Sequence, residues 1–290
     1  LYYFVLRLKN KNVCTLFPRV IVNLKENLAI PLTIVFNKSI KEGVVPEDWR
    51  LANVTPIFKK GSKTDAANYR PVSLTSVICR VLESLLRDVI VDHLVKYKLI
   101  QNTQHGFVPR RSCLTNLLEY LEEMTKLVDE GHNVDVVYLD FAKAFDKVAH
   151  TRLMIKCRAH GIVGEVAAWI EAWLGGRKQR VVLNGQESSW LEVTSGVPQG
   201  SVLGPILFVI FINDIDTALE KAGLFLSKFA DDTKSGRVID TEEGVQGLQK
   251  DLDRFTEWAK EWQMQFNVGK CKVLHFGSTN PRNKYTMDGA

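Results

Sequence analysis

The chain has 290 residues, of which 46% are hydrophobic and 24% charged, an ordinary balance for a globular protein with a sizeable core. Its net charge of +5 suits a nucleic-acid partner without requiring one. No apolar run reaches the ~18 residues of a membrane span. The five cysteines are scattered and lack CxxC spacing, which argues against a disulfide framework or a zinc knuckle. They favour a reducing, intracellular compartment.

The first half of the chain is predicted to mix helices and strands. Residues 1–16 match no pattern that we can interpret. Apolar residues at helical spacing predict helices, and short apolar or β-branched runs predict strands. The helices are expected at 18–37, 76–94 and 113–129, and the strands at 52–58 and 134–140.

The second half adds helices and two hairpins. Helices are expected at 143–159, 164–174, 201–222 and 245–262, hairpins at 179–193 and 224–237, and a last strand at 271–276. The first hairpin contains Asn184-Gly185, which strongly favours a two-residue turn. This mixture of elements predicts an α+β fold in which helices cover one side of a sheet.

Carboxylates at strand ends are the most informative feature of the chain. Asp140 follows an apolar strand, and Asp231 and Asp232 occupy the tip of the second predicted hairpin. Carboxylates ~4 Å apart repel by roughly 4 kcal/mol at an effective dielectric of 20, so their convergence requires Mg²⁺ or bound protons. Paired divalent ions catalyse phosphoryl transfer at such sites. Asp146 is expected to be structural, in the first turn of the following helix, where the helix dipole favours a carboxylate.

Three segments, in this order, resemble motifs A, B and C of reverse transcriptases. They are Asp140-Phe-Ala-Lys-Ala-Phe-Asp146, Gly196-Val-Pro-Gln-Gly-Ser-Val-Leu-Gly-Pro205 and Phe229-Ala-Asp-Asp232. Residues 68–74, 104–107 and 211–215 are similar to the Jockey and chicken-repeat branches of LINE-type (non-LTR) retrotransposons. The chain therefore resembles the polymerase domain of such an element from about residue 18 to 289.

This resemblance implies a right-hand polymerase without its thumb. Residues 17–133 would form a fingers-like region with an N-terminal helix, and 134–290 a palm with an antiparallel sheet backed by helices. The two would interleave in one reverse transcriptase domain, and a further motif would begin at 285–289.

The resemblance also implies the catalytic residues. Asp140 and Asp231 would bind two Mg²⁺ ions, with Mn²⁺ as a possible substitute, and Asp232 would complete the acidic cluster. Lys270, with Lys272 as an alternative, would protonate the departing pyrophosphate. Phe145 would lie under the sugar of the incoming nucleotide and exclude a 2′-hydroxyl, although a phenylalanine at this spacing also suits a core.

The remaining residues implied by the resemblance would bind nucleotide or nucleic acid. The triphosphate would meet Lys59, Lys60, Arg70, the backbone of Phe141, and Ala142, because guanidinium and ammonium groups grip phosphate oxygens. Gln199 would hydrogen-bond a nucleotide beside Gly200, where glycine permits close backbone approach. Template RNA and primer would contact Gln104, Gly106, Phe107, Arg110, Arg111, Ser112, Arg180 and Pro198, although exposed lysines and arginines are also ordinary surface residues.

The expected activity is RNA-directed DNA polymerisation. A DNA primer 3′-hydroxyl would attack a dNTP paired with an RNA template. By resemblance to LINE elements, the primer would be nicked chromosomal DNA in the nucleus. Two alternatives stay open: an inactive, RNA-binding remnant of a retroelement, and an intron-type maturase. The oligomeric state is not predicted.

Overall fold

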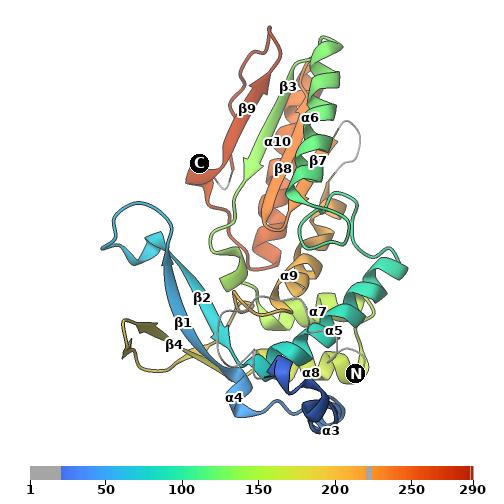
Figure 1. Ribbon diagram of the computed structural model, residues 1–290. Helices are drawn as coiled ribbons and strands as arrows, with labels where there is room; N and C mark the ends of the chain where they lie inside the picture. Colours follow the sequence, from blue (N-terminus) through green and yellow to red (C-terminus); the bar gives the residue numbers. More distant parts are fainter. Residues whose placement is uncertain (1–20, 220–223, 288, 290) are drawn as a thin grey trace. The chain divides into compact units, whose positions relative to one another are not determined.

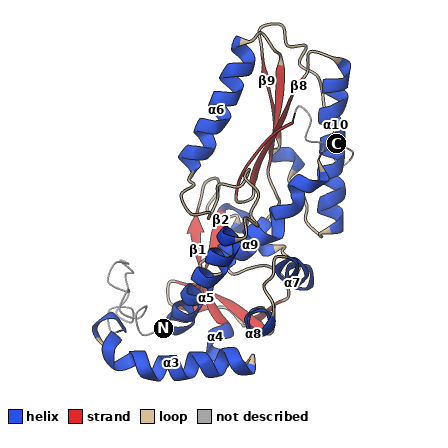
Figure 2. Ribbon diagram, turned by 90° about the vertical axis from the view of Figure 1, so that its right-hand side faces the viewer, coloured by secondary structure: helices blue, strands red, loops and turns tan. Residues whose placement is uncertain are grey.

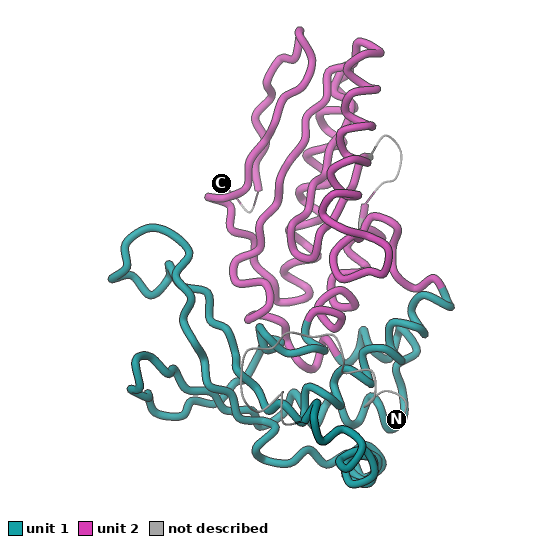
Figure 3. The backbone as a smooth tube through the Cα atoms, in the orientation of Figure 1, with its two compact units in different colours: residues 1–97, 154–204 teal, residues 98–153, 205–290 magenta. Residues whose placement is uncertain are grey.

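The computed structural model describes residues 21–219, 224–287 and 289. They fold into two compact units, each assembled from two separate stretches of chain (Figure 3). Unit 1 comprises residues 1–97 and 154–204, and unit 2 comprises residues 98–153 and 205–290. The uninterpreted residues 1–16 and the first residues of the helix expected at 18–37 lie outside the described residues.

Unit 1 contains a mixed sheet. Strand β1 (Leu51–Phe58) pairs antiparallel with β2 (Tyr69–Thr75) and parallel with β4 (Arg177–Leu183). The chain then turns through Asn184 and Gly185, whose φ angles of +49° and +78° suit a two-residue hairpin turn, so the predicted turn is confirmed. The short strands β5 (Gln186–Glu187) and β6 (Leu191–Val193) pair with β4.

Helices complete unit 1. They are α3 (Lys25–Glu42), α4 (Glu47–Arg50), the 3₁₀ turn η2 (Ala66–Asn68), α5 (Val77–Lys96) and α8 (Gly164–Leu174). Ser76 caps α5 by accepting the amide of Cys79, as a helix start requires. Buried aromatic rings fill the core, among them Phe36, which meets Trp49 edge-on, and the stacked pair Trp169 and Trp173.

Unit 2 contains an antiparallel sheet in the order β7 (Leu224–Phe229), β8 (Asp232–Val238), β3 (Val134–Leu139) and β9 (Lys272–Phe276) (Figure 1). Helix α6 (Cys113–Asp129) covers one face, where Tyr120 and Met124 pack with Val134 and Val136. Helix α10 (Glu242–Glu261) covers the other face (Figure 2).

The prediction that helices cover only one side of this sheet is therefore wrong. Strand β3 is buried on both faces, which explains its nearly continuous apolar sequence. Its single acidic residue, Asp135, is fully buried and accepts hydrogen bonds from Tyr285 Oη at 2.7 Å and Asn280 Nδ2 at 2.9 Å. On the same face, Arg237 of β8 pairs with the buried Asp251 of α10 at 2.5 Å. These polar contacts tie the sheet to α10 and to the C-terminal segment.

Two of the predicted helices are interrupted. The helix expected at 143–159 divides into the 3₁₀ turn η3 (Ala144–Asp146) and α7 (His150–Ala159), so Asp146 does not lie in the first turn of an α-helix. The helix expected at 201–222 divides into α9 (Gly204–Ile212) and the 3₁₀ turn η4 (Asn213–Ala218), and residues 220–222 lie outside the described part. At this break the side chain of Asn213 donates to the carbonyl of Leu99 at 2.7 Å and accepts the amide of Gln101 at 2.9 Å.

The last short element is the 3₁₀ turn η5 (Val268–Lys270), just before β9. Over the described residues, none of the helices combines the length and apolarity needed to cross a bilayer.

Candidate functional site

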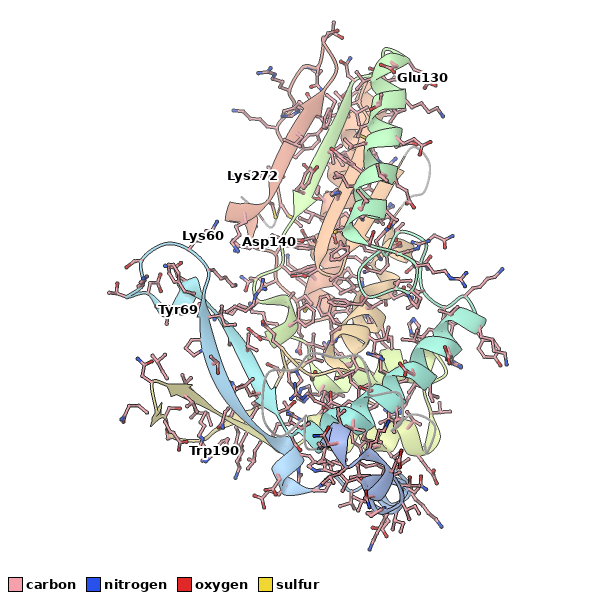
Figure 4. All side chains as sticks on the ribbon, viewed as in Figure 1. Lys60, Tyr69, Glu130, Asp140, Trp190 and Lys272 are labelled. Atoms are coloured by element: carbon pink, nitrogen blue, oxygen red, sulfur yellow. The ribbon has the colours of Figure 1, made fainter. Side chains whose placement is uncertain are left out.

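The three candidate carboxylates lie at one end of the unit 2 sheet. In the antiparallel register of β3 and β8, Leu139 pairs with Thr233. Asp140 and Asp232 are the residues directly beyond this pair on the two strands, and the negative charge of Asp140 acts on Asp232. Asp231 is the neighbouring residue in the turn between β7 and β8. Figure 4 shows Asp140 immediately beyond the carboxyl end of β3.

The acidic residues at this end of the sheet interact with each other and with two lysines. Partial burial and the negative charge of Asp140 raise the pKa of Asp232, while the Lys234 ammonium works in the opposite direction. Within the described residues, Oδ2 of Asp140 is buried and accepts no hydrogen bond, although Lys270 Nζ forms an ion pair with it at 3.3 Å. Asp140 and Asp232 therefore repel each other, and Lys234 and Lys270 offset part of this repulsion.

These carboxylates suit Mg²⁺. The described residues contain no group of three His, Cys, Asp or Glu side chains already arranged to hold a metal. Mg²⁺ does not need such a group, because it commonly uses one or two carboxylates and completes its shell with water and substrate phosphates. The buried oxygen of Asp140 and the repulsion felt by Asp232 are what a divalent cation would relieve. We infer that Asp140 and the 231–232 turn fit such an ion.

Residues 265–267 lie against Asp140 and support it. Asn267 donates its amide to the carbonyl of Asp140 at 2.7 Å, and Ala142 donates its amide to the carbonyl of Gln265 at 2.8 Å. The rings of Phe141 and Phe266 stack with centroids 4.2 Å apart. The amide of Ala142, a residue expected near the triphosphate, is thus bonded to Gln265. Lys270, a few residues further along the chain, forms an ion pair with Asp140.

Phe145 lies in the 3₁₀ turn that follows Asp140. Its half-buried ring stacks on Phe208 of α9, with centroids 4.4 Å apart and an interplanar angle of 15°. Phe208 itself is fully buried. The ring of Phe145 is therefore held in one orientation with part of its surface accessible, which fits either the predicted contact with a sugar or a simple packing role.

In unit 1, the predicted nucleotide-binding loop packs against β2. The carbonyl of Gln199 accepts the amide of Ser73 at 2.7 Å. Gly200 has φ +114°, and a Cβ there would come within 2.7 Å of the carbonyl oxygen of Ser73. Pro198 accepts two hydrogen bonds from Ser201 at its carbonyl, from the amide at 3.1 Å and from Oγ at 2.8 Å. Close backbone packing therefore accounts for Gly200.

A buried glutamate that the sequence analysis missed holds the same loop. Glu83 of α5 is inaccessible to solvent and accepts the amides of Val202 at 2.7 Å and Leu203 at 3.3 Å. Burial lowers the pKa of the nearby Arg177, and the Glu83 charge works against that shift. Spacing could have revealed Glu83, because it lies four residues after Cys79 and three before Leu86 on the buried face of α5.

Some of the predicted basic residues of unit 1 are exposed to solvent, and one is bonded to other side chains of the unit. Lys59 and Lys60 lie in the exposed loop after β1 (Figure 4 labels Lys60), and Arg70 is exposed on β2. Arg180 instead donates to Asn53 Oδ1 at 2.9 Å, pairs with Glu187, and stacks over Trp190 at 4.5 Å. Lys59, Lys60 and Arg70 are thus the members of this set that present their charge to solvent.

The predicted template-binding segment 104–112 is mostly structural within unit 2. Gln104 is buried against the β7–β8 turn, and Arg111 binds the carbonyl oxygens of Asn102 and Gln104. Ser112 caps α6 by accepting the amide of Thr115 at 3.2 Å. Other residues of the segment, Phe107 and Arg110, are exposed and adopt positive φ angles of +59° and +63°.

Two further residues beside the carboxylates were not anticipated. Lys234 follows Asp232 by two positions on β8 and so points to the same face of the strand. Its ammonium donates to Asn116 Oδ1 at 3.0 Å and lies 4.6 Å from the ring centre of Tyr120. No sequence spacing links Asn116 to Lys234, because they meet only through tertiary packing.

Comparison with known proteins identifies relatives of this chain. A family model described as "Reverse transcriptase (RNA-dependent DNA polymerase)" matches residues 57–287. The RNA-directed DNA polymerase from mobile element jockey of Drosophila funebris is 30% identical over 268 residues, covering 89% of this chain and 29% of that protein. The probable RNA-directed DNA polymerase from transposon X-element of Drosophila melanogaster is 30% identical over 250 residues, covering 84% and 27%. The predicted resemblance to Jockey-type elements is confirmed, and the chain spans less than a third of these relatives.

Solved structures support the fold. An apo telomerase from Candida tropicalis, truncated from its C-terminal domain, matches with a TM-score of 0.61 at 13% identity, covering 91% of this chain and 58% of that one. Similarity at this level of identity concerns the fold alone. The α+β class predicted from the sequence is confirmed.

Proposed function

Because this chain belongs to the reverse transcriptase (RNA-dependent DNA polymerase) family, we propose that it is a polymerase domain that extends a DNA primer on an RNA template. The observation that carries this proposal is the β3–β8 register, which ends at the pair Leu139 and Thr233 and so brings Asp140 and the 231–232 turn to the same end of the sheet. These residues belong to separate stretches of the sequence, and the sheet brings them to one end. Palm and fingers roles for units 2 and 1 are part of the proposal, and the functional division expected at 133/134 stays a prediction.

The acidic residues would hold two Mg²⁺ ions, with Asp140 and Asp231 as ligands and Asp232 as the third carboxylate. When bound, such ions activate the attacking oxygen and stabilise the leaving group in phosphoryl transfer. The protein's own contribution is positioning. The Asn267 amide fixes the backbone of Asp140, and the pairing of Leu139 with Thr233 anchors the strand end that carries Asp232.

Lys270 is the proposed proton donor to the pyrophosphate. Its ammonium already pairs with Asp140 at 3.3 Å, although its side chain is largely exposed. An exposed lysine can leave a carboxylate when a phosphate arrives, because a solvent-exposed ion pair is worth only about 0–1 kcal/mol. The ammonium of Lys270 can thereby leave Asp140 and give one of its protons to an oxygen of the departing pyrophosphate.

Phe145 is the proposed selector of dNTP over rNTP. A ring stacked on the buried Phe208 cannot easily turn aside, so it would collide with a 2′-hydroxyl above it. Lys59, Lys60 and Arg70 present exposed positive charge in unit 1 and would bind the triphosphate. Gln199, Phe107 and Arg110 are the proposed contacts to nucleotide and template.

The biological setting is inferred from relatives. Proteins named for jockey and X-element are RNA-directed DNA polymerases of mobile elements. We propose that this chain likewise serves retrotransposition, with the RNA of an element as template and chromosomal DNA in the nucleus as primer.

Primer extension tests this function. The 290-residue chain, and a form extended to the length of its relatives, are mixed with an RNA template, a DNA primer, dNTPs and Mg²⁺. We expect extension that stops when Asp231 is replaced by asparagine. Template binding without extension by either form, in Mg²⁺ and in Mn²⁺, would support the inactive RNA-binding remnant instead. A dependence on intron RNA would support the maturase.

A further inference from the structure

The turn that carries Asp231 has a strained backbone. Ala230, the residue directly before Asp231, has φ +56°, a left-handed conformation that residues with a Cβ seldom adopt. Such a conformation persists only where neighbouring groups hold it. The direction of the Asp231 side chain depends on this peptide, so whatever fixes Ala230 also aims Asp231.

The side chain of Gln104 holds Ala230. Its Oε1 accepts the amide of Ala230 at 2.9 Å and the amide of Gly106 at 2.8 Å, and its Nε2 donates to the carbonyl of Ala230 at 3.4 Å. Gln104 is 1% exposed. One carboxamide therefore binds both backbone groups of the residue before Asp231, and it does so away from competing water.

The backbone around Gln104 keeps the carboxamide in place. The amide of Lys228 donates to Thr103 and the amide of His105 donates to Lys228, each at 2.8 Å, so residues 103–105 run beside β7 as a short parallel bridge. A Cβ on Gly106 would collide with the Ala230 amide and lie 3.0 Å from its Cα. The segment thus needs a glycine at 106 to approach the turn.

The hydrogen bonds and the burial of Gln104 favour a role other than the template contact expected from the sequence. We propose that Gln104 is a positioning residue: it locks the left-handed Ala230 peptide and thereby directs the Asp231 carboxylate toward the bound divalent cation. Gly106 permits this contact by leaving room for Ala230. The inference rests on the proposed function, because it concerns the metal-binding geometry of that site.

The test replaces Gln104 by methionine, which has similar length and offers none of these hydrogen bonds. Removing a group that orients a metal ligand typically costs roughly 10–100-fold in metal affinity or activity. We expect Mn²⁺ affinity, measured by electron paramagnetic resonance, to fall by such a factor, and kcat with it. The dissociation constant for a fluorescent RNA–DNA primer–template should stay within about twofold, as expected for a residue that supports the metal ligand.

Two further variants complete the design. Gln104→Glu keeps an oxygen that can accept both amides, so we expect it to recover part of the Mn²⁺ affinity. Asp240→Asn weakens the bond to the amide of Asn133, 2.8 Å long, at the opposite end of the same sheet. It serves as a matched control that should bind Mn²⁺ as the wild type does.

The outcomes separate the two proposals. Weaker primer–template binding by Gln104→Met with unchanged Mn²⁺ affinity would overturn the positioning role in favour of a template contact. Equal loss of Mn²⁺ affinity in Asp240→Asn would also overturn it, because the effect would then be general destabilisation. A wild-type chain that binds Mn²⁺ but never extends a primer would contradict the proposed function and leave the Mn²⁺ comparison intact.

Discussion

Replacing Glu83 tests how the loop around Gln199 is held. Glu83 has no exposure to solvent, and its carboxylate accepts the amides of Val202 at 2.7 Å and Leu203 at 3.3 Å. Arg177, which is 2% exposed, interacts electrostatically with it. Glu83→Ala leaves the buried amides of Val202 and Leu203 without their acceptor, and each such unsatisfied group costs about 1–3 kcal/mol. Glu83→Gln keeps the shape and one acceptor oxygen, so we expect a loss of about 1.5–3 kcal/mol, the value of hydrogen bonds to a charged group.

Urea denaturation of both variants, followed by tryptophan fluorescence, measures these losses, because Trp169 and Trp173 lie in the core of the same unit. The KM for dNTP should rise in Glu83→Gln, since the displaced loop carries Gln199. A loss below about 1 kcal/mol in Glu83→Ala, the size of an exposed pair, would refute the reasoning. So would a loss in Glu83→Gln equal to that in Glu83→Ala.

Three more predictions concern single residues. Phe145→Val should lower the preference for dNTP over rNTP by at least about tenfold, or ~1.4 kcal/mol, in single-nucleotide incorporation; an unchanged preference would restrict Phe145 to packing. The pKa of Asp232 is raised in the folded state, so the free energy of unfolding falls as the pH rises above the ordinary aspartate pKa. Asp232→Asn removes this charge and should therefore melt at a higher temperature than the wild type at neutral pH in EDTA. An equal or lower melting temperature would contradict the repulsion from Asp140. Gly200→Ala should cost about 1–3 kcal/mol, because its Cβ would meet the Ser73 carbonyl at 2.7 Å, and urea denaturation showing no loss would contradict that contact.

Local patterns predicted the regular elements well. Helices α6 (Cys113–Asp129) and α8 (Gly164–Leu174) have the predicted limits, because caps and apolar periodicity act within a few residues. Strand β2 escaped prediction since Pro71, which faces Pro56 across the strand pair, makes its sequence look unlike a strand. The 3₁₀ turns η3 and η4 were missed because apolar spacing does not distinguish them from α-helix, and the side chain of Asn213 in η4 bonds Leu99 and Gln101, which lie far from it in the sequence.

In the candidate site, too, some residues could be identified from local sequence motifs and others only from tertiary contacts. Motif spacing singled out the carboxylates and Phe145, and the roles expected for them stay predictions. Gln104 and Ala230, by contrast, are separated by 126 positions, so the motif suggested a contact with template where the fold shows a hydrogen bond to the turn before Asp231. Glu83 and Lys234 likewise depend on partners that only packing supplies.

Anomalous scattering from crystals of the chain with RNA template, DNA primer, a non-hydrolysable dNTP and Mn²⁺ tests the central claim most directly. We predict two Mn²⁺ peaks roughly 3.5–4 Å apart, each bound by carboxylate oxygens of both Asp140 and Asp231. Separation of these two carboxylates by well over ~8 Å, about twice the spacing of paired metal ions, would contradict the account.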